Sequence, residues 1–425
     1  MIAEASALSA LGVTVLLVLC RPRIGGLIVG PAPAALAGVL LMAAAGHVTL
    51  DDAGEAATVL WRPLIAIASI MLIAAAAGHL GVINRLAATV LPLAGNSARS
   101  LFLLVFVLSA LTAAVLNNDS AILVLTPLVV VLIRQIFPDR PALVVPYAFA
   151  VFMAAGVAPL VTSNPINLIV ADFAGLDFNA YAVRMMPVAL VSAVVTFFVL
   201  RRLFDADLRA AGAVRLDAVR SGPEPPTRWP PPERYGLLLV FGVLGAYPLA
   251  AYLGADVWPV ALAGAIVASL LCARYGVISP GRLVAGGVAW QILVFLLGVF
   301  TLALGLRNAG AVDWLIALYT PPDLATIGVV SAVGSALINN HSMALTNIVA
   351  IDALPGAHTR ELLAALIGGD LGPRLLPIGS LAGLLWYAIL ERMDVAVPLM
   401  QFVRIGVIVT APSMAAALAA LALAG

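Results

Sequence analysis

The chain has 425 residues, of which 63% are hydrophobic and only 10% are charged. A soluble domain has about 45–50% apolar and about 25% charged residues, so this composition excludes a water-soluble fold and predicts a polytopic membrane protein. The 22 basic residues are all Arg and are balanced by 21 acidic ones, which excludes a nucleic-acid-binding surface and a Walker A loop with its essential Lys.

The first apolar segment, from Ala5 to Cys20, resembles a signal peptide, but Glu4 precedes it and no positive charge does. We therefore interpret it as the first of about ten membrane-spanning helices, at roughly 20 residues each. Further apolar segments follow at 24–46, 60–78, 100–116, 120–136, 141–160, 184–203, 235–253, 256–273, 284–306, 323–338, 341–352, 360–371, 377–390 and 396–423. The Pro-rich, mixed-charge stretch 205–234 is typical of an extended linker.

The Arg residues predict the orientation, because cytoplasmic loops carry an excess of positive charge. If the first helix runs inward, sixteen of the 22 Arg residues are cytoplasmic, including the seven between residues 201 and 234. Arg62, Arg184, Arg307 and Arg360 are then outside, together with the acidic loop at 51–55. This count requires that 100–136 and 323–352 are re-entrant hairpins, and it gives five crossings in each half with opposite orientations.

The two halves share landmarks at matching places. Asn117-Asn118-Asp119-Ser120 divides the first hairpin and Asn339-Asn340-His341-Ser342 divides the second. An interrupted helix follows each hairpin, with its break at 158–167 or at 368–380. Gly and Pro often only kink membrane helices, but paired interruptions in inverted halves indicate a transporter's binding site.

We therefore predict an all-α polytopic membrane protein with two inverted-topology repeats, whose two hairpins and two broken helices meet at the centre. The first repeat is 1–204, with hairpin 100–136 and broken helix 141–175. The cytoplasmic linker is 205–234. The second repeat is 235–425, with hairpin 323–352 and broken helix 360–390.

Several runs resemble the ArsB arsenite/antimonite efflux pump family, within the ion-transporter superfamily that also contains sodium-coupled dicarboxylate carriers. They are Asn118-Asp119 with 121–127, Ser163-Asn164 with Asn167 and 171–173, 290–292, 305–310, Asn339-Asn340, and 370–373 with 377–386. The resemblance spans nearly the whole chain. It implies export of the neutral trihydroxides of trivalent arsenic or antimony in exchange for protons, across the bacterial inner membrane. The family can also work with a separate cytoplasmic ATPase subunit. His341 departs from the pattern, where close relatives are expected to have Met.

A trihydroxide can be bound by thiolates or by amides and hydroxyls. The two cysteines, Cys20 and Cys272, lie at predicted helix ends away from the hairpin tips, so a thiolate metal site is not expected and no cofactor is implied. Amides and hydroxyls offer both donors and acceptors. The predicted substrate-binding residues are Asn117, Asn118, Ser120, Ser163, Asn164, Asn167, Asn339, Asn340, Ser342, Gly372 and Ser380.

A coupled proton needs a titratable carrier, and carboxylates inside membrane segments are functional by default. Asp119 and Asp370 are the only carboxylates in the motif regions. Asp119 could instead cap a helix, Asp370 could pair permanently with Arg374, and His341 is a third candidate.

Three alternatives remain open. A sodium-coupled carboxylate carrier or a Na+/H+ antiporter of the same superfamily would hold Na+ on the Asn and Ser oxygens, although a dianion would find only Arg374 nearby. A passive channel would ignore the proton gradient. An intramembrane enzyme is disfavoured, because HExxH, GxSxG and CxxC motifs are absent from the sequence.

The sequence predicts both termini outside and the linker in the cytoplasm.

Overall fold

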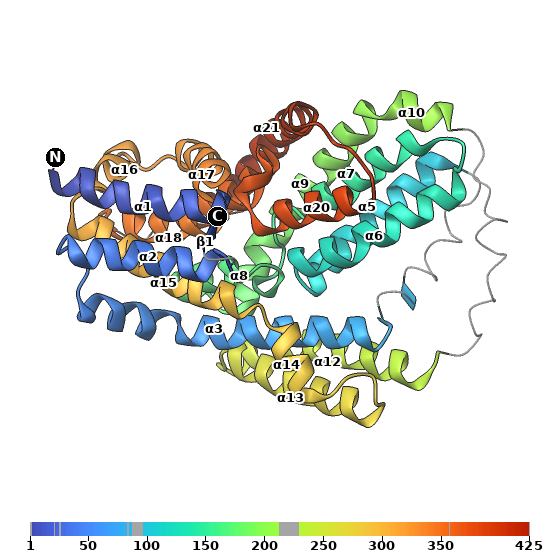
Figure 1. Ribbon diagram of the computed structural model, residues 1–425, viewed down its shortest axis with the longest axis horizontal. Coiled ribbons are helices and arrows are strands. Elements are labelled where there is room, and N and C mark those ends of the chain that lie inside the picture. The colour runs from blue at the N-terminus through green and yellow to red at the C-terminus, as the bar shows by residue number, and fades with distance from the viewer. Residues whose placement is uncertain are drawn as a thin grey trace.

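The computed structural model describes residues 2–20, 22–24, 27–82, 85–86, 97–211, 229–356 and 358–424. Over these ranges the chain is helical apart from turns and one short antiparallel pair of strands, as Figure 1 shows. Seven of the described helices are long and apolar enough to cross a membrane, and several shorter apolar helices accompany them. The predicted all-α polytopic membrane fold is thus confirmed.

The first half contains the strand pair, one hairpin and one broken helix. Its elements are α1 (Ile2–Cys20), β1 (Arg23–Ile24), β2 (Leu27–Ile28), α2 (Pro31–Ala44), α3 (Leu50–His79), α5 (Ala98–Val115), α6 (Asn118–Ile136), η2 (Pro141–Leu143), α7 (Val144–Ala154), η3 (Val161–Ser163), α8 (Pro165–Phe173), α9 (Phe178–Leu203) and α10 (Asp205–Ala210). The strands pair Arg23 with Ile28 and Ile24 with Leu27.

The second half repeats the hairpin and the broken helix. Its elements are α12 (Pro231–Tyr252), α13 (Val257–Arg274), α14 (Pro280–Gly287), α15 (Trp290–Asn308), α16 (Asp313–Leu318), α17 (Leu324–Ile338), α18 (Asn340–Asp352), α19 (Thr359–Leu371), η4 (Gly372–Arg374), η5 (Pro377–Gly379), α20 (Leu381–Arg392) and α21 (Leu399–Ala424). The hairpins α5–α6 and α17–α18 and the broken helices α7–α8 and α19–α20 overlap the ranges named from the sequence, although α5 begins before residue 100, α19 begins before residue 360 and α20 ends after residue 390.

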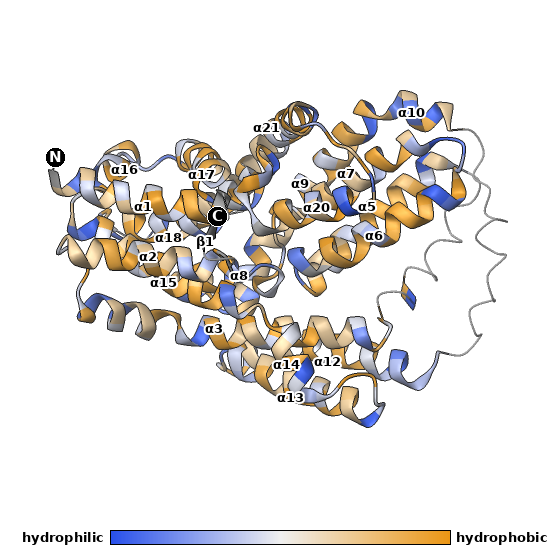
Figure 2. Ribbon diagram, in the orientation of Figure 1, coloured by the Kyte–Doolittle hydropathy of each residue, from blue (hydrophilic) through white to orange (hydrophobic). Residues whose placement is uncertain are grey.

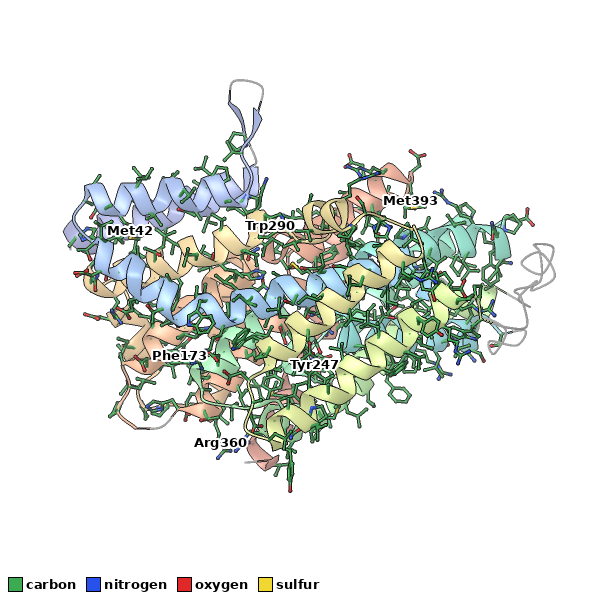
Figure 3. The ribbon with its side chains drawn as sticks, turned by 90° about the horizontal axis from the view of Figure 1, so that it is seen from below. Met42, Phe173, Tyr247, Trp290, Arg360 and Met393 are labelled. Carbon is green, nitrogen blue, oxygen red and sulfur yellow. The ribbon has the colours of Figure 1, made fainter. Side chains whose placement is uncertain are left out.

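Hydrophobic residues predominate along most helices (Figure 2), and many large ones are exposed on the surface of the protein. Leu40, Val183 and Leu190 are each more than 60% exposed. In water such a surface would be costly, but in a bilayer it faces lipid tails of the same polarity. Figure 3 shows Met42, near the end of α2, and Met393, just after α20, toward opposite ends of the long axis.

Ion pairs and hydrogen bonds join charged residues that the Arg distribution places on the same side. At one end Arg99 pairs with Asp205, Arg85 pairs with Glu233, and Arg140 donates to the carbonyl oxygen of Ala210. At the other end Arg307 pairs with Glu55, and Arg62 pairs with Asp256.

Two predicted boundaries need correction. The acidic stretch at 51–55 is the start of α3 and not a loop, because Thr49 and Asp52 form a capping box that begins the helix at Leu50. The stretch 205–234 is not extended throughout: α10 occupies its start, where Leu208 is buried, and α12 begins at Pro231. The remaining part, 212–228, lies outside the described residues.

Glycines let α19 pack directly against α17. A Cβ at Gly368 would overlap the carbonyl oxygen of Gly328, whereas a Cβ at Gly369 would lie 3.8 Å from Ser335 Oγ, an ordinary contact. We expect Gly368→Ala to lower the free energy of unfolding by about 1–3 kcal/mol, as overpacking does.

The neighbouring substitution is the control for this prediction. Gly369→Ala should be neutral or stabilising by up to about 1 kcal/mol, since Ala favours a helix interior. Thermal unfolding of the two purified variants measures the difference, and equal stabilities would contradict the close packing of α17 and α19.

Candidate functional site

The two hairpins turn sharply at asparagines. Asn117 separates α5 from α6 with φ of 155°, and Asn339 separates α17 from α18 with φ of 78°. Asn tolerates positive φ better than most residues. Asn339 Oδ1 also accepts a hydrogen bond from the backbone N–H of His341, so this side chain shapes the tip and caps α18.

Each broken helix restarts at a capped N-terminus. Asn164 caps α8 and accepts from the N–H of Ile166, with Pro165 at the first helical position. Ser380 caps α20 and accepts from the N–H of Gly383 at 3.0 Å. Both caps lie at equivalent places in the two halves, and the first turns of both helices present N–H groups and a positive dipole end.

The tips and breaks converge on one small cavity of about 30 Å³, enough for about one water molecule. Seven predicted site residues line this central cavity: Asn118, Asp119, Asn164, Asn340, His341, Asp370 and Ser380. The other lining residues are Ile122, Phe152, Ala155, Pro373, Arg374 and Ala382. The fold therefore brings together side chains that are far apart in the sequence, the first at residue 118 and the last at residue 382.

Asp370 joins the two broken helices. Its Oδ1 accepts from Asn164 Nδ2 at 2.7 Å and its Oδ2 accepts from the N–H of Ala158 at 3.1 Å. Arg374 donates to Thr196 and to the carbonyl oxygen of Met153. Among the described residues no ion pair joins Asp370 to Arg374, so the direct pairing considered from the sequence is absent there.

The other predicted binding residues are not among those that line the central cavity. Ser163 donates to the carbonyl oxygen of Ala114 at the end of α5, and Asn167 donates to the hydroxyl of Tyr181. Gly372 packs against α17, where a Cβ would overlap the carbonyl oxygen of Ala332. Ser342 is buried in the first turn of α18, and the side chain of Ser120 lies outside what the structure describes.

The cavity wall from the second hairpin presents hydrogen-bond acceptors. His341 Nδ1 lies 3.2 Å from Asn339 Oδ1, and since that oxygen can only accept, Nδ1 carries the proton. In a neutral imidazole Nε2 is then an acceptor. Nε2 of His341 and Oδ1 of Asn340 are buried and have no hydrogen-bond partner in the described chain. A bound molecule with hydroxyl groups would satisfy both.

Two larger cavities lie at different levels along α3. One, of about 420 Å³, reaches from Met71 to His79 and shares Asp119 with the central cavity. The other, of about 150 Å³, contains Arg62 and Asp172.

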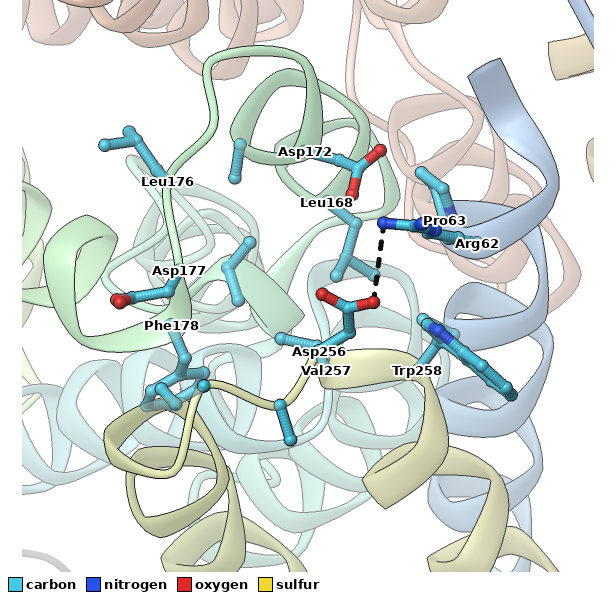
Figure 4. A pocket seen from close by; sticks show the side chains of 16 residues that line it. Arg62, Pro63, Leu168, Asp172, Leu176, Asp177, Phe178, Asp256, Val257 and Trp258 are labelled. Carbon is cyan, nitrogen blue, oxygen red and sulfur yellow. Dashed lines mark ion pairs between the residues drawn. The ribbon is translucent and has the colours of Figure 1, made fainter. Parts of the chain in front are cut away.

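Figure 4 shows two carboxylates beside Arg62 in this second cavity, Asp172 at the end of α8 and Asp256 at 3.5 Å from the Arg62 guanidinium, while Asp177 lies across the cavity from them. Since α8 starts at the central cavity and its nine residues span about 13 Å, α8 connects the central cavity with this second one.

Cys272 is buried in α13, and the side chain of Cys20 lies outside what the structure describes. Within the described residues no group of three or more His, Cys, Asp or Glu side chains could hold a metal ion.

Two contributors are not among the predicted site residues, although the sequence already suggested Arg374 as a partner of Asp370. Tyr181 in α9 donates to the carbonyl oxygen of Ala158 inside the first break and accepts from Asn167, and Arg374 lines the cavity through contacts with the opposite half. Tyr181 carries no motif signal. Arg374 carries one, because an arginine within an apolar segment needs buried partners.

Comparisons with known proteins agree with this architecture. The family model described as a citrate transporter matches residues 14–369. An "Arsenical pump membrane protein" of Escherichia coli (strain K12) is 30% identical over 421 residues, covering 96% of both chains. A "Putative arsenical pump membrane protein" of Bacillus subtilis (strain 168) is 28% identical and covers 93% of this chain and 94% of its own. The crystal structure of the Alcanivorax borkumensis YdaH transporter matches with a TM-score of 0.57 at 15% identity and covers 99% of this chain and 96% of its own.

Proposed function

This chain belongs to the citrate-transporter family of membrane carriers, and within it to the arsenical pump membrane proteins, and we propose that it exports arsenite or antimonite as the neutral trihydroxide in exchange for protons. It is a multi-pass membrane protein, which we place in the bacterial inner membrane with both termini outside and the 205–234 segment in the cytoplasm. The binding groups are the amides, hydroxyls and imidazole around the central cavity.

The observation that supports this proposal is the group of hydrogen-bond acceptors around the central cavity, two of which, Asn340 Oδ1 and His341 Nε2, have no partner among the described residues. Asp119, Asp370, Asn340 Oδ1 and His341 Nε2 face a space with room for about one water molecule. A trihydroxide has three O–H donors that can bind these acceptors. Because a buried acceptor without a hydrogen bond costs free energy, satisfying these acceptors increases the affinity for the trihydroxide. The cavity must widen to admit it.

The same charges disfavour a carboxylate substrate. Citrate would bring carboxylates to a cavity lined by Asp119 and Asp370, and the one guanidinium group there, that of Arg374, already donates to Thr196 and Met153. Like charges at short range repel strongly where water is scarce. A neutral substrate avoids this cost.

The two larger cavities support alternating access. The cavity that shares Asp119 lies toward the end of the molecule that carries Arg85, Arg99 and Asp205, and the cavity at Arg62 lies toward the other end. A carrier needs one route from each side to a central site. In this proposal arsenite enters beside Asp119 and leaves along α8.

The decisive experiment is arsenite uptake into inverted vesicles with the proton gradient, sodium and ATP varied independently. We expect accumulation that follows the proton gradient and is indifferent to sodium. Sodium-dependent uptake would favour a sodium-coupled carrier, gradient-insensitive flux would indicate a channel, and a requirement for ATP would indicate an ATPase partner.

The asparagines at the two tips should contribute similarly to binding. Asn118→Ala and Asn340→Ala each remove one hydrogen-bonding group from the cavity, worth about 0.5–1.5 kcal/mol, so each should raise the KM for arsenite several-fold. Asn179→Ala is the control, because Asn179 contacts the carbonyl oxygen of Pro248 away from the cavity. Parental KM values in both tip variants would contradict substrate binding at the tips.

A further inference from the structure

Arg374 reaches from the second half of the chain into the first. It lies in η4, within the second break, and its side chain is only 2% exposed. Nη1 donates to Thr196 Oγ1 in α9 at 3.1 Å, and Nη2 donates to the carbonyl oxygen of Met153 in α7. Both partners belong to the first half.

The guanidinium group occupies the gap where α7 ends. Met153 is in the last turn of α7, where carbonyl groups lack partners within the helix and the dipole is negative. The chain leaves the helix at Ala155, and a Cβ at the next residue, Gly156, would overlap Nη2 of Arg374. A side chain at position 156 would therefore have to displace the guanidinium group from its hydrogen-bonding partners.

Asp370 and Arg374 hold opposite sides of the same break. Arg374 binds Met153 just before the break, and Asp370 binds Ala158 and Asn164 within it. We propose that Arg374 is a positioning residue, which fixes the first break against the second broken helix and thereby sets the place of the Asp370 carboxylate in the central cavity. This inference rests on the proposed function and deepens it.

Thr196 and Arg374 each make a further contact with α21. Thr196 Oγ1 lies 2.9 Å from Ser413 Oγ in α21, and a Cβ at Gly406 in the same helix would overlap the carbonyl oxygen of Arg374. The planar guanidinium can bind two acceptors in fixed directions, whereas a lysine ammonium is a point charge on a flexible stem. The geometry therefore requires arginine and not merely a positive charge.

The first test separates positioning from general stability. Thr196→Val removes one hydrogen-bond acceptor of Arg374 without changing any charge. Arg374→Lys keeps the positive charge but loses the planar group that donates to two acceptors at once. Per folded molecule, we expect both variants to raise the KM for arsenite several-fold, more in Arg374→Lys, with maximal rates close to the parent. Arg404→Lys, at an exposed arginine in α21, should change neither. Reduced protein levels with a parental KM would overturn the positioning role.

The second test needs no substrate. Gly156→Ala should lower the melting temperature of the purified protein through the overlap with Arg374. Combined with Arg374→Ala, which vacates the space, the same substitution should cause little further loss. If the Arg374→Ala protein is not produced in the membrane, Arg374→Lys takes its place in this comparison. Additive losses would overturn the proposal, whatever the transported substrate proves to be.

Discussion

Asp370→Asn should abolish proton-driven arsenite accumulation and lower the melting temperature. The parental carboxylate accepts two hydrogen bonds, from Asn164 Nδ2 and from the N–H of Ala158. An amide has a single acceptor oxygen, so its NH2 group must face one of these two donors. An unsatisfied buried group of this kind costs about 1–3 kcal/mol, and the negative charge near Arg374 is also lost.

A double variant tests this reasoning directly. In Asp370→Asn with Asn164→Asp the new amide can donate to the new carboxylate and still accept from Ala158, so the hydrogen bonds are complementary again. Asp also caps a helix about as well as Asn, which preserves the start of α8. Thermal unfolding should recover toward the parent in the double variant. An Asp370→Asn single variant with parental stability and accumulation would show that these contacts do not matter.

The sequence predicts the parts of the fold that have local signals. The hairpins and the broken helices follow from apolar arms around Asn-rich tips and from paired Pro and Gly interruptions, and the helices of the structure overlap these ranges with ends that differ by a few residues. Seven of the predicted site residues meet at one cavity for the same reason, since the repeat brings equivalent landmarks to the centre.

Side-chain direction has no such local signal. Asn167 and Ser163 lie in the predicted motif but point to Tyr181 and to the end of α5. Gly372 lies in the second break because α17 packs against it and leaves no room for a Cβ. These outcomes depend on tertiary neighbours that are distant in sequence. Charge patterning was similarly misleading at 51–55, where a capping box turns an acidic stretch into the first turn of α3.

Asp119→Asn should separate binding from coupling. Asp119 lies in the first turn of α6 and lines both the central cavity and the larger cavity beside it. In the described part of the chain no hydrogen bond holds its carboxylate, so the side chain is free to exchange protons. The amide keeps the shape but cannot titrate. We expect this variant to bind arsenite and to equilibrate it across the membrane without accumulating it against a gradient.

Asp177→Asn is the matched control for this prediction. Asp177 caps α9 by accepting from the N–H of Ala180 at 2.7 Å and lies in the Arg62 cavity, away from the central one. Because Asn caps a helix about as well as Asp, this variant should accumulate arsenite at the parental rate. If Asp119 were only a cap, Asp119→Asn would behave in the same way. Proton-driven accumulation by Asp119→Asn at the parental rate would therefore assign the coupled proton to Asp370 or His341.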